Sequence, residues 1–412
     1  MTVQIPAGYK QTEVGVIPED WECQILDDLA KRGSGHTPNK KIPEYWNGSI
    51  KWISLRDSDT LDNLFIEDTV TKISKKGLDN SSAVLHPAGT VVLSRDAGVG
   101  KSAIMKYEMA VSQHFMAWQC KSYLNNKFLY FYLQSKKTEF ERIAMGSTIK
   151  TIGLPYFKEF KVPQPSIEEQ QAIADALSHA DALIESLEQL IAKKSQIKQG
   201  AMQELLTGQR RLPGFSGEWL ATRLGDVAEF FKGKGLPKSQ ITPDGSDACI
   251  HYGELFTHYP ETINKIIGRT NGEKDSFRSL DNDVLMPTSD VTPRGLAKAS
   301  CLRVNDVVLG GDILVIRSDK NKINGSFLSY LIRNNEDSVL QLVTGSTVFH
   351  LYGSDMKNFI FSMPSISEQN EIVSILSAID AELNVLETRL SKASQIKQGM
   401  MQKLLTGRIR LI

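Results

Sequence analysis

The chain has 412 residues, 41% of them hydrophobic and 23% charged, and its 48 basic residues balance 48 acidic ones. This length supports two or three domains with cores of their own, and the neutral balance argues against a strong stand-alone nucleic-acid binder. No apolar run reaches the roughly 18–20 residues of a membrane span, and the N-terminus lacks the apolar core of a signal peptide. We therefore expect a cytoplasmic protein that does not contact a membrane.

The four cysteines and seven histidines form no recognisable pattern. The cysteines lack the paired spacing of a disulfide framework or a zinc site, and no HExxH motif occurs. The sequence predicts no metal-dependent catalyst.

Most of the chain consists of an internal sequence repeat. SQIKQGAMQELLTG at 195–208 returns as SQIKQGMMQKLLTG at 394–407, displaced by about 199 residues. The same displacement carries Gly-Ser-Thr at 146–148 onto 345–347. A period near 200 residues is far too long for a solenoid unit, so the chain consists of two homologous halves.

Each half begins with a tryptophan, Trp21 or Trp219, followed by a loop rich in glycine and lysine. Short segments with strand composition follow, at 49–55, 90–94 and 102–107 and again at 247–253, 283–287 and 312–317. NKFLYFYLQS predicts a helix at 126–135 that reappears as GSFLSYLIRN at 325–334. Each half is predicted to be an α+β domain with a mixed sheet.

A long helix is predicted to end each half. Ser166 with Glu169, and Ser365 with Glu368, have the spacing of a capping box. The glycine of each LLTG segment ends the helix about 40 residues later.

Apolar residues in both long helices recur in alternating steps of four and three, which is typical of a coiled-coil seam. The seam residues include Ile173, Leu177, Ile184, Leu187, Ile191, Ile372, Leu376, Leu383, Leu386 and Leu390. An amphipathic helix packed on its own domain is the alternative. The duplication of the seam favours pairing of the two helices.

The segment GVGKS at 98–102 invites comparison with a phosphate-binding loop. That loop requires a glycine where this chain has Arg95, and the residues after Ser102 have strand character. We therefore expect a hairpin loop. No GxSxG nucleophile elbow and no glycine and N/D-P-P-Y/F motifs of a DNA methyltransferase occur, so the chain is predicted to be non-catalytic.

Polar loops in both halves carry basic or hydroxyl side chains that suit phosphates and base edges. Each one alone is more often a solvated surface group, and their matched placement in two domains favours DNA binding. The candidates are Lys31, Arg32, Lys40, Lys41, Arg56, Arg95, Lys101, Thr148, Lys150, Lys232, Lys234, Lys238, Lys274, Arg278, Arg294, Lys298 and Thr347.

The whole chain resembles the specificity subunits of type I restriction–modification systems. The resemblance lies in the helices after PSIEEQ and PSISEQ, the SQIKQG…LLTG tails, and the PEDW and SGEW segments. TPNKKIPEYWNGSIKWISLRD and GKGLPKSQI are similar to the openings of target recognition domains in that family.

The resemblance implies two target recognition domains, at 1–162 and 211–361, and two long helices, at 163–210 and 362–412. The helices would pair as an antiparallel coiled coil with pseudo-twofold symmetry. Each domain would read one half of a split sequence in double-stranded DNA. Two methyltransferase subunits and the restriction subunits would be partners, and S-adenosylmethionine, ATP and magnesium would belong to them, with no cofactor on this chain.

Two rival functions belong to other classes. One is a coiled-coil scaffold protein without DNA specificity of its own, and the other is a nucleotide-hydrolysing enzyme built on GVGKS. A DNA mobility shift together with a partner methyltransferase tests the first rival. ATP binding by the isolated chain tests the second.

Overall fold

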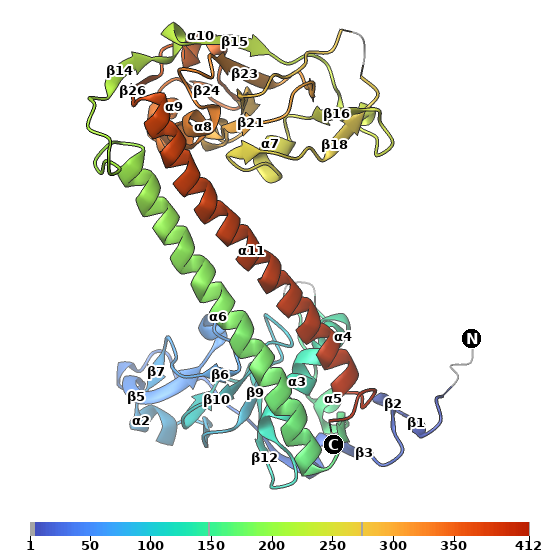
Figure 1. Ribbon diagram of the computed structural model, residues 1–412. Helices are drawn as coiled ribbons and strands as arrows, with labels where there is room; N and C mark the ends of the chain where they lie inside the picture. The colour runs from blue at the N-terminus through green and yellow to red at the C-terminus, as the bar shows by residue number, and fades with distance from the viewer. Residues whose placement is uncertain (1–4, 147–148, 273–274, 412) are drawn as a thin grey trace. The chain divides into compact units, whose positions relative to one another are not determined.

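The structure is a computed structural model that describes residues 5–146, 149–272 and 275–411 (Figure 1). The chain divides into two compact units: unit 1 contains Met1–Glu188 and Thr388–Ile412, and unit 2 contains Gln189–Glu387. Each unit combines one α+β domain with half of each long helix. The units therefore cut across the four segments expected from the sequence, and both are described separately.

The domain of unit 1 is built on two sheets. Across the five-stranded sheet lie β4 (Ala30–Ser34), β12 (Phe115–Cys120), β9 (Val91–Ser94), β10 (Ser102–Met105) and β6 (Phe65–Ile66). The four-stranded sheet contains β7 (Lys72–Ile73), β5 (Trp46–Ile53), β11 (Met109–Val111) and β8 (Leu85–His86). The pairs β6–β10 and β5–β11 are parallel and the other pairs are antiparallel, so both sheets are mixed.

Small elements complete this domain. The pairs β1 (Tyr9–Thr12) with β2 (Gly15–Pro18) and β3 (Glu22–Ile25) with β13 (Lys161–Gln164) form separate two-stranded sheets. The helices are α1 (Leu26–Leu29), α2 (Lys75–Asp79), α3 (Asn126–Ser135), α4 (Lys137–Ile143) and α5 (Leu154–Lys158). Helix α3 packs on β9 and β10, and its Phe128, Leu129 and Phe131 are fully buried in the core.

The domain of unit 2 repeats this plan. Its five-stranded sheet contains β15 (Ala228–Lys232), β23 (Ile313–Ser318), β19 (Asp283–Pro287), β21 (Ser300–Leu302) and β17 (Thr262–Ile263). Its second sheet contains β18 (Gly268–Thr270), β16 (Asp247–Ile250) and β22 (Val308–Leu309). Smaller sheets pair β14 (Leu220–Arg223) with β26 (Ile360–Met363), and β20 (Ser289–Asp290), β25 (Phe349–His350) and β24 (Thr344–Gly345). The helices are α7 (Glu254–Thr257), α8 (Gly325–Asn334), α9 (Glu336–Leu340) and α10 (Gly353–Met356).

Every strand segment expected from the sequence contains a strand, and both short helices lie at the residues predicted, as α3 and α8. The mixed α+β class is therefore confirmed. The GVGKS segment is the hairpin loop between the antiparallel strands β9 and β10, with Gly98 and Gly100 both at a φ of +86°. Because a strand and not a helix follows Lys101, the phosphate-binding reading is excluded on geometry.

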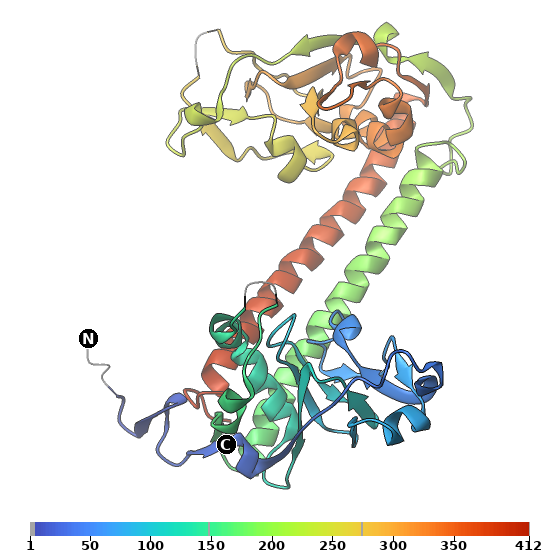
Figure 2. The ribbon, with the colours of Figure 1, turned by 180° about the vertical axis from the view of Figure 1, so that it is seen from behind.

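The two long helices are α6 (Ile167–Leu205) and α11 (Ile366–Leu404), each of 39 residues. Figures 1 and 2 show their segments side by side in each unit, α6 in green and α11 in red. Ion pairs join Asp181 to Lys397 in unit 1 and Lys198 to Asp380 in unit 2. In unit 2 Lys194 also pairs with Glu382, so partner numbers fall on α11 as they rise on α6. In unit 1 Ile173 and Leu177, earlier on α6 than Asp181, share a core with Leu404, later on α11 than Lys397. The pairing within each unit is therefore antiparallel. In the part of the chain that the structure describes, no helix is long and apolar enough to cross a membrane.

The ten expected seam residues fall into two groups by environment. Ile173 and Leu177 are buried in the unit 1 core that also contains Leu404, the last residue of α11, and Leu405. In unit 2, Ile372 and Leu376 are likewise buried in a core that includes Met202, Leu205 and Leu206. For these four residues, packing on a domain and pairing of helices occur together.

The other seam residues lie farther along the helices. Leu187 and Leu386 are buried, with 9% of each side chain exposed. Ile184, Ile191, Leu383 and Leu390 are half-buried. Partial exposure is what a two-helix seam produces, since only one side of each helix is covered.

The predicted capping boxes are half right. Ser166 Oγ accepts the Glu169 N–H at 3.2 Å, and Ser365 Oγ accepts the Glu368 N–H at 3.3 Å. The reciprocal half of the prediction is wrong, because both glutamate carboxylates turn toward a tryptophan and an arginine instead of the serine N–H. The C-terminal glycines are confirmed, with φ of +71° at Gly208 and +68° at Gly407.

Candidate nucleic-acid interface

Each domain has a cavity lined by the loop that follows the first strand of its five-stranded sheet, β4 or β15. The first cavity lies at the ends of β5 and β11, and the second lies at the end of β18 and the start of β22. The cavity in the first domain has a volume of about 500 Å³ and that in the second about 240 Å³. The loops concerned are the two glycine- and lysine-rich loops noted in the sequence.

The first cavity has an aromatic wall. Trp46 and Trp52 meet edge to face, with ring centroids 5.3 Å apart. Both indole N–H groups are already used, because Trp46 donates to the carbonyl of Asn39 and Trp52 to that of His36, each at 3.2 Å. The rings therefore offer apolar surface to whatever enters the cavity.

Two cations line the same cavity. Lys40 follows β4, and Arg56 lies in the short 3₁₀ turn Leu55–Asp57 that follows β5. Both are exposed, and neither forms an ion pair with any residue that the structure describes. A capping interaction at Ser54, which accepts the Arg56 N–H at 3.3 Å, fixes the turn that carries Arg56. A guanidinium without a protein partner is available to pair with a phosphate or a guanine edge.

A histidine–carboxylate pair stands beside these cations. His114 Nδ1 lies 2.7 Å from Asp96 Oδ2, and Asp96 is buried. Gln113 Oε1 accepts from Thr37 Oγ1 at 2.6 Å, which ties the loop after β4 to the loop before β12. The hydroxyl of Ser112, another lining residue, is buried without a hydrogen-bond partner in the described structure. The cavity thus joins apolar rings to hydrogen-bonding groups and free cations.

The second cavity has no aromatic wall. Its lining includes Lys234, Gln240, Asn271 and Asp275, with Leu236 and Val308 as apolar members. Lys234 and Asp275 form a long ion pair of 3.8 Å at the surface. Amide and carboxylate groups line it, in contrast to the tryptophans and the histidine of the first cavity. The two cavities therefore differ in their chemistry.

The remaining basic candidates have more varied surroundings. Several form intramolecular pairs: Arg32 with Asp27, Arg95 with Asp96, Lys232 with Asp312, Arg278 with Asp247 and Asp306, and Arg294 with Glu336. Lys101 donates to the carbonyl of Ser58 at 2.8 Å and Lys298 to that of Phe256 at 2.7 Å. The exposed side chains are those of Lys31, Lys41, Lys150, Lys238 and Thr347. Thr148 and Lys274 lie outside the described residues.

Arg278 has a structural role within its own domain. Its guanidinium donates to Asp247 at 2.7 Å and to Asp306 at 3.1 Å, and so joins the start of β16 to the loop before β22. Hydrogen bonds from Ser246 and Arg278 lower the pKa of Asp247 to about 2. Such a clamp favours a fixed loop over a free DNA contact.

The sequence reasoning missed the polar junctions between each domain and its long helix. In unit 1 the buried Gln170 accepts the backbone N–H of Asn125 at 2.8 Å, and Asn125 caps α3. In unit 2 Gln369 accepts the N–H of Asn324 at 2.9 Å, and Asn324 caps α8. The glutamines are the last residues of PSIEEQ and PSISEQ, so the repeat itself was the available signal.

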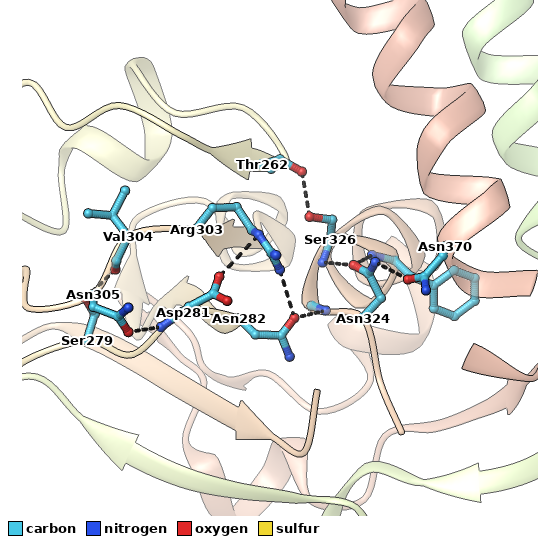
Figure 3. Close-up of polar contacts among 12 residues, drawn as sticks. Thr262, Ser279, Asp281, Asn282, Arg303, Val304, Asn305, Asn324, Ser326 and Asn370 are labelled. Atoms are coloured by element: carbon cyan, nitrogen blue, oxygen red, sulfur yellow. Dashed lines mark hydrogen bonds and ion pairs between the residues drawn. The ribbon is translucent and has the colours of Figure 1, made fainter. Parts of the chain in front are cut away.

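Figure 3 shows the unit 2 junction in detail. Asn324 donates through Nδ2 to Asn370 of α11 at 2.8 Å. Beside it, Asn282 Oδ1 accepts from Arg303 at 3.3 Å and from the Gly325 N–H at 2.7 Å. Asn282 has a φ of +81°, a conformation that asparagine tolerates better than most residues. These bonds connect the sheet, α8 and α11 within unit 2.

Comparison with known proteins identifies the family. A family model described as type I restriction modification DNA specificity domain matches residues 18–198 and again 216–396. The MjaIX type I restriction enzyme specificity subunit of Methanocaldococcus jannaschii is 25% identical over 98% of this chain and 96% of its own length. The EcoR124I/EcoR124II specificity subunit of Escherichia coli is 28% identical over 43% of this chain and 45% of its own length.

Solved structures agree on the fold. The S subunit of a type I restriction–modification system from Mycoplasma genitalium has a TM-score of 0.62 at 16% identity, covering 93% of this chain and 96% of that one. A chain from a study of type I complex assembly has a TM-score of 0.55 at 16% identity, covering 95% and 99%. With two copies of the family domain spanning most of its length, the chain belongs to the type I restriction–modification specificity subunits.

Proposed function

We propose that the chain is the DNA-reading subunit of a type I restriction–modification complex and is itself non-catalytic. Its two domains each read one half of a split target in double-stranded DNA. The observation that carries this proposal is the pair of homologous domains, each with a cavity beside the loop after the first strand of its five-stranded sheet and each with its own lining chemistry. Different linings in two homologous domains suit two different half-sequences.

The first cavity and its rim supply the polar contacts for the first half-sequence. Arg56 matches the hydrogen-bonding edge of guanine or a phosphate, and Lys40 matches a phosphate. In the second domain Gln240 and Asn271 carry amides, the group that hydrogen-bonds to the adenine edge, and Asn271 Oδ1 also accepts the Ser246 N–H at 3.1 Å. The neutral net charge fits a reader that shares its grip on the DNA backbone with other subunits.

The long helices provide the surface for two methyltransferase subunits. Helix α6 exposes Leu183, Leu190 and Ile197, one residue per heptad, with 55%, 41% and 46% of each side chain exposed. An exposed apolar stripe of this kind is typical of a protein–protein contact. Restriction subunits complete the assembly, and S-adenosylmethionine, ATP and magnesium bind to the partner subunits.

The proposal is tested by producing the chain with the methyltransferase subunits of its own system. Sequencing of methylated bases in cells that carry the complex should show one bipartite motif with two different half-sequences. A mobility shift should show specific DNA binding only when the methyltransferase is present. A complex that assembles yet methylates no defined sequence would support the scaffold alternative.

A further inference from the structure

The first domain is fastened to the long helices by the last residues of the chain. Arg410 donates from Nε and Nη2 to the carboxylate of Glu169, at 2.5 and 2.7 Å, and reaches Asp20 at 2.8 Å. Trp21 Nε1 donates to the same Glu169 carboxylate at 3.0 Å, and the Arg410 guanidinium lies 5.7 Å from the Trp21 ring. All four residues belong to unit 1.

The second domain has the same fastening. Arg211, just after α6, donates from Nε and Nη2 to Glu368 at 2.7 and 2.8 Å. Trp219 Nε1 donates to Glu368 at 3.1 Å, and the Arg211 guanidinium lies 5.6 Å from the Trp219 ring. These three residues belong to unit 2.

The two glutamate carboxylates in these contacts are buried, so each depends on its arginine for stability. Glu169 is 1% and Glu368 2% exposed, and a carboxylate buried without a cation is costly. The hydrogen bonds to Glu169 and Asp20 raise the pKa of Arg410, and those to Glu368 raise the pKa of Arg211. Each arginine also makes two parallel bonds, a geometry that fixes direction as well as distance.

The fastening joins the elements that orient each domain. Trp21 and Trp219 stand at the start of the two domains, directly before β3 and β14. Glu169 and Glu368 precede Gln170 and Gln369, which hold the caps of α3 and α8. A change at the arginine therefore reaches the angle between the domain and its helix.

Each arginine contacts the domain that belongs to the other half of the sequence. Arg211 ends the first half of the sequence but holds the domain of the second half, and Arg410 ends the second half but holds the domain of the first. The two arginines stand at equivalent places in LLTGQRR and LLTGRIR.

We propose that Arg410 and Arg211 are positioning residues, and that each controls recognition of the half-sequence read by the opposite half of the chain. This rests on the proposed DNA-reading function. The last residues of the chain thus govern the first recognition domain, some 390 positions away in sequence.

The test compares Arg410→Gln with Arg211→Gln in the full-length chain, assembled with its methyltransferase subunits. Methylation rates are measured on the cognate duplex and on duplexes with one substituted base in either half-sequence. Arg410→Gln should lower the discrimination against substituted bases in the first half-sequence by about tenfold. It should leave discrimination in the second half-sequence unchanged, because only unit 1 then contains a buried carboxylate without its cation. Arg211→Gln should give the opposite pattern.

Matched variants separate positioning from general instability. Arg408→Gln changes an exposed arginine in the same tail and should leave both half-sequences unchanged. Arg410→Lys keeps the charge but loses the paired geometry, so it should show a weaker form of the Arg410→Gln pattern and serves if that variant does not fold. Equal loss at both half-sequences, or no loss at either, would overturn the inference. A wild-type complex without sequence preference would instead refute the proposed function.

Discussion

At the scale of single residues, the number of protein partners separates candidate DNA contacts from structural charges. Lys40 and Arg56 line a cavity without an ion pair to the described residues, whereas Arg278 is held by two carboxylates. The sequence alone does not distinguish Lys40, Arg56 and Arg278, which are all basic residues in polar loops. Burial and partner geometry distinguish them, because a charge that is already neutralised gains little from a phosphate.

The first prediction concerns Arg56. Arg56→Ala should weaken discrimination at one position of the first half-sequence by about 1–3 kcal/mol if the guanidinium pairs with a guanine. The second half-sequence should be unaffected, because we propose that the other domain reads it. Methylation rates on substituted duplexes measure this, with Arg294→Ala as the control for loss of an exposed, ion-paired arginine. A uniform loss across all duplexes would assign Arg56 to a phosphate.

Lys101 permits a second prediction at this scale. Its ammonium donates to the Ser58 carbonyl within the first domain, so Lys101→Ala should lower the free energy of unfolding by about 1 kcal/mol. Denaturant unfolding measures the change. The isolated wild-type chain should show no ATP binding by calorimetry. ATP affinity that disappears in Lys101→Ala would restore the nucleotide-binding alternative.

At the scale of elements, α6 carries both buried and exposed apolar side chains, and we expect them to have separate roles. Leu187 lies in the seam and is buried, whereas Leu183 is mostly exposed. We expect the first to be needed for helix pairing and the second to be available to a partner subunit.

This difference gives the third prediction. Leu187→Asp and Leu386→Asp each bury a charge and should lower stability by several kcal/mol. Leu183→Asp should leave the unfolding transition within about 0.5 kcal/mol and weaken methyltransferase assembly, because only exposed surface changes. Thermal unfolding and size-exclusion chromatography with the methyltransferase distinguish the two. Normal assembly by Leu183→Asp would remove the stripe from the docking surface.

At the scale of the whole molecule, the internal repeat makes each half a possible substitute for the other. The tail at 195–211 corresponds to 394–410, including the arginine that closes each fastening. A half-chain therefore contains every group needed to hold the domain of a second copy. An isologous dimer satisfies both copies at once.

The fourth prediction follows. A chain ending at residue 212 should dimerise and, with methyltransferase subunits, specify a palindromic split site built from the first half-sequence. A chain ending at residue 208 lacks Arg211 and should dimerise more weakly, because Glu169 then remains buried without its cation. Analytical ultracentrifugation and sequencing of methylated bases test both chains. A strictly monomeric longer chain, or a non-palindromic motif, would count against the prediction.

The sequence by itself determined the duplication, the α+β class and the positions of α3, α8 and both long helices. These features depend on local signals: repeated letters, strand composition, heptad spacing and terminal glycines such as Gly208 and Gly407. Patterns of this kind can be recognised within short segments of sequence, so they predict structure without knowledge of the fold.

Only the tertiary structure decided which polar groups meet. The spacing of Ser166 and Glu169 predicted a capping box, yet the carboxylate binds Trp21 and Arg410, residues that lie 148 and 241 positions away. Trp46 and Trp52 line a cavity with His114 only because strand β5 and the loop before β12 lie together in the fold. A local capping bond is worth about 1 kcal/mol, and two charge-assisted bonds to a buried carboxylate outweigh it. Contacts between residues so far apart in the sequence produce no sequence pattern that would predict them, so only the tertiary structure reveals them.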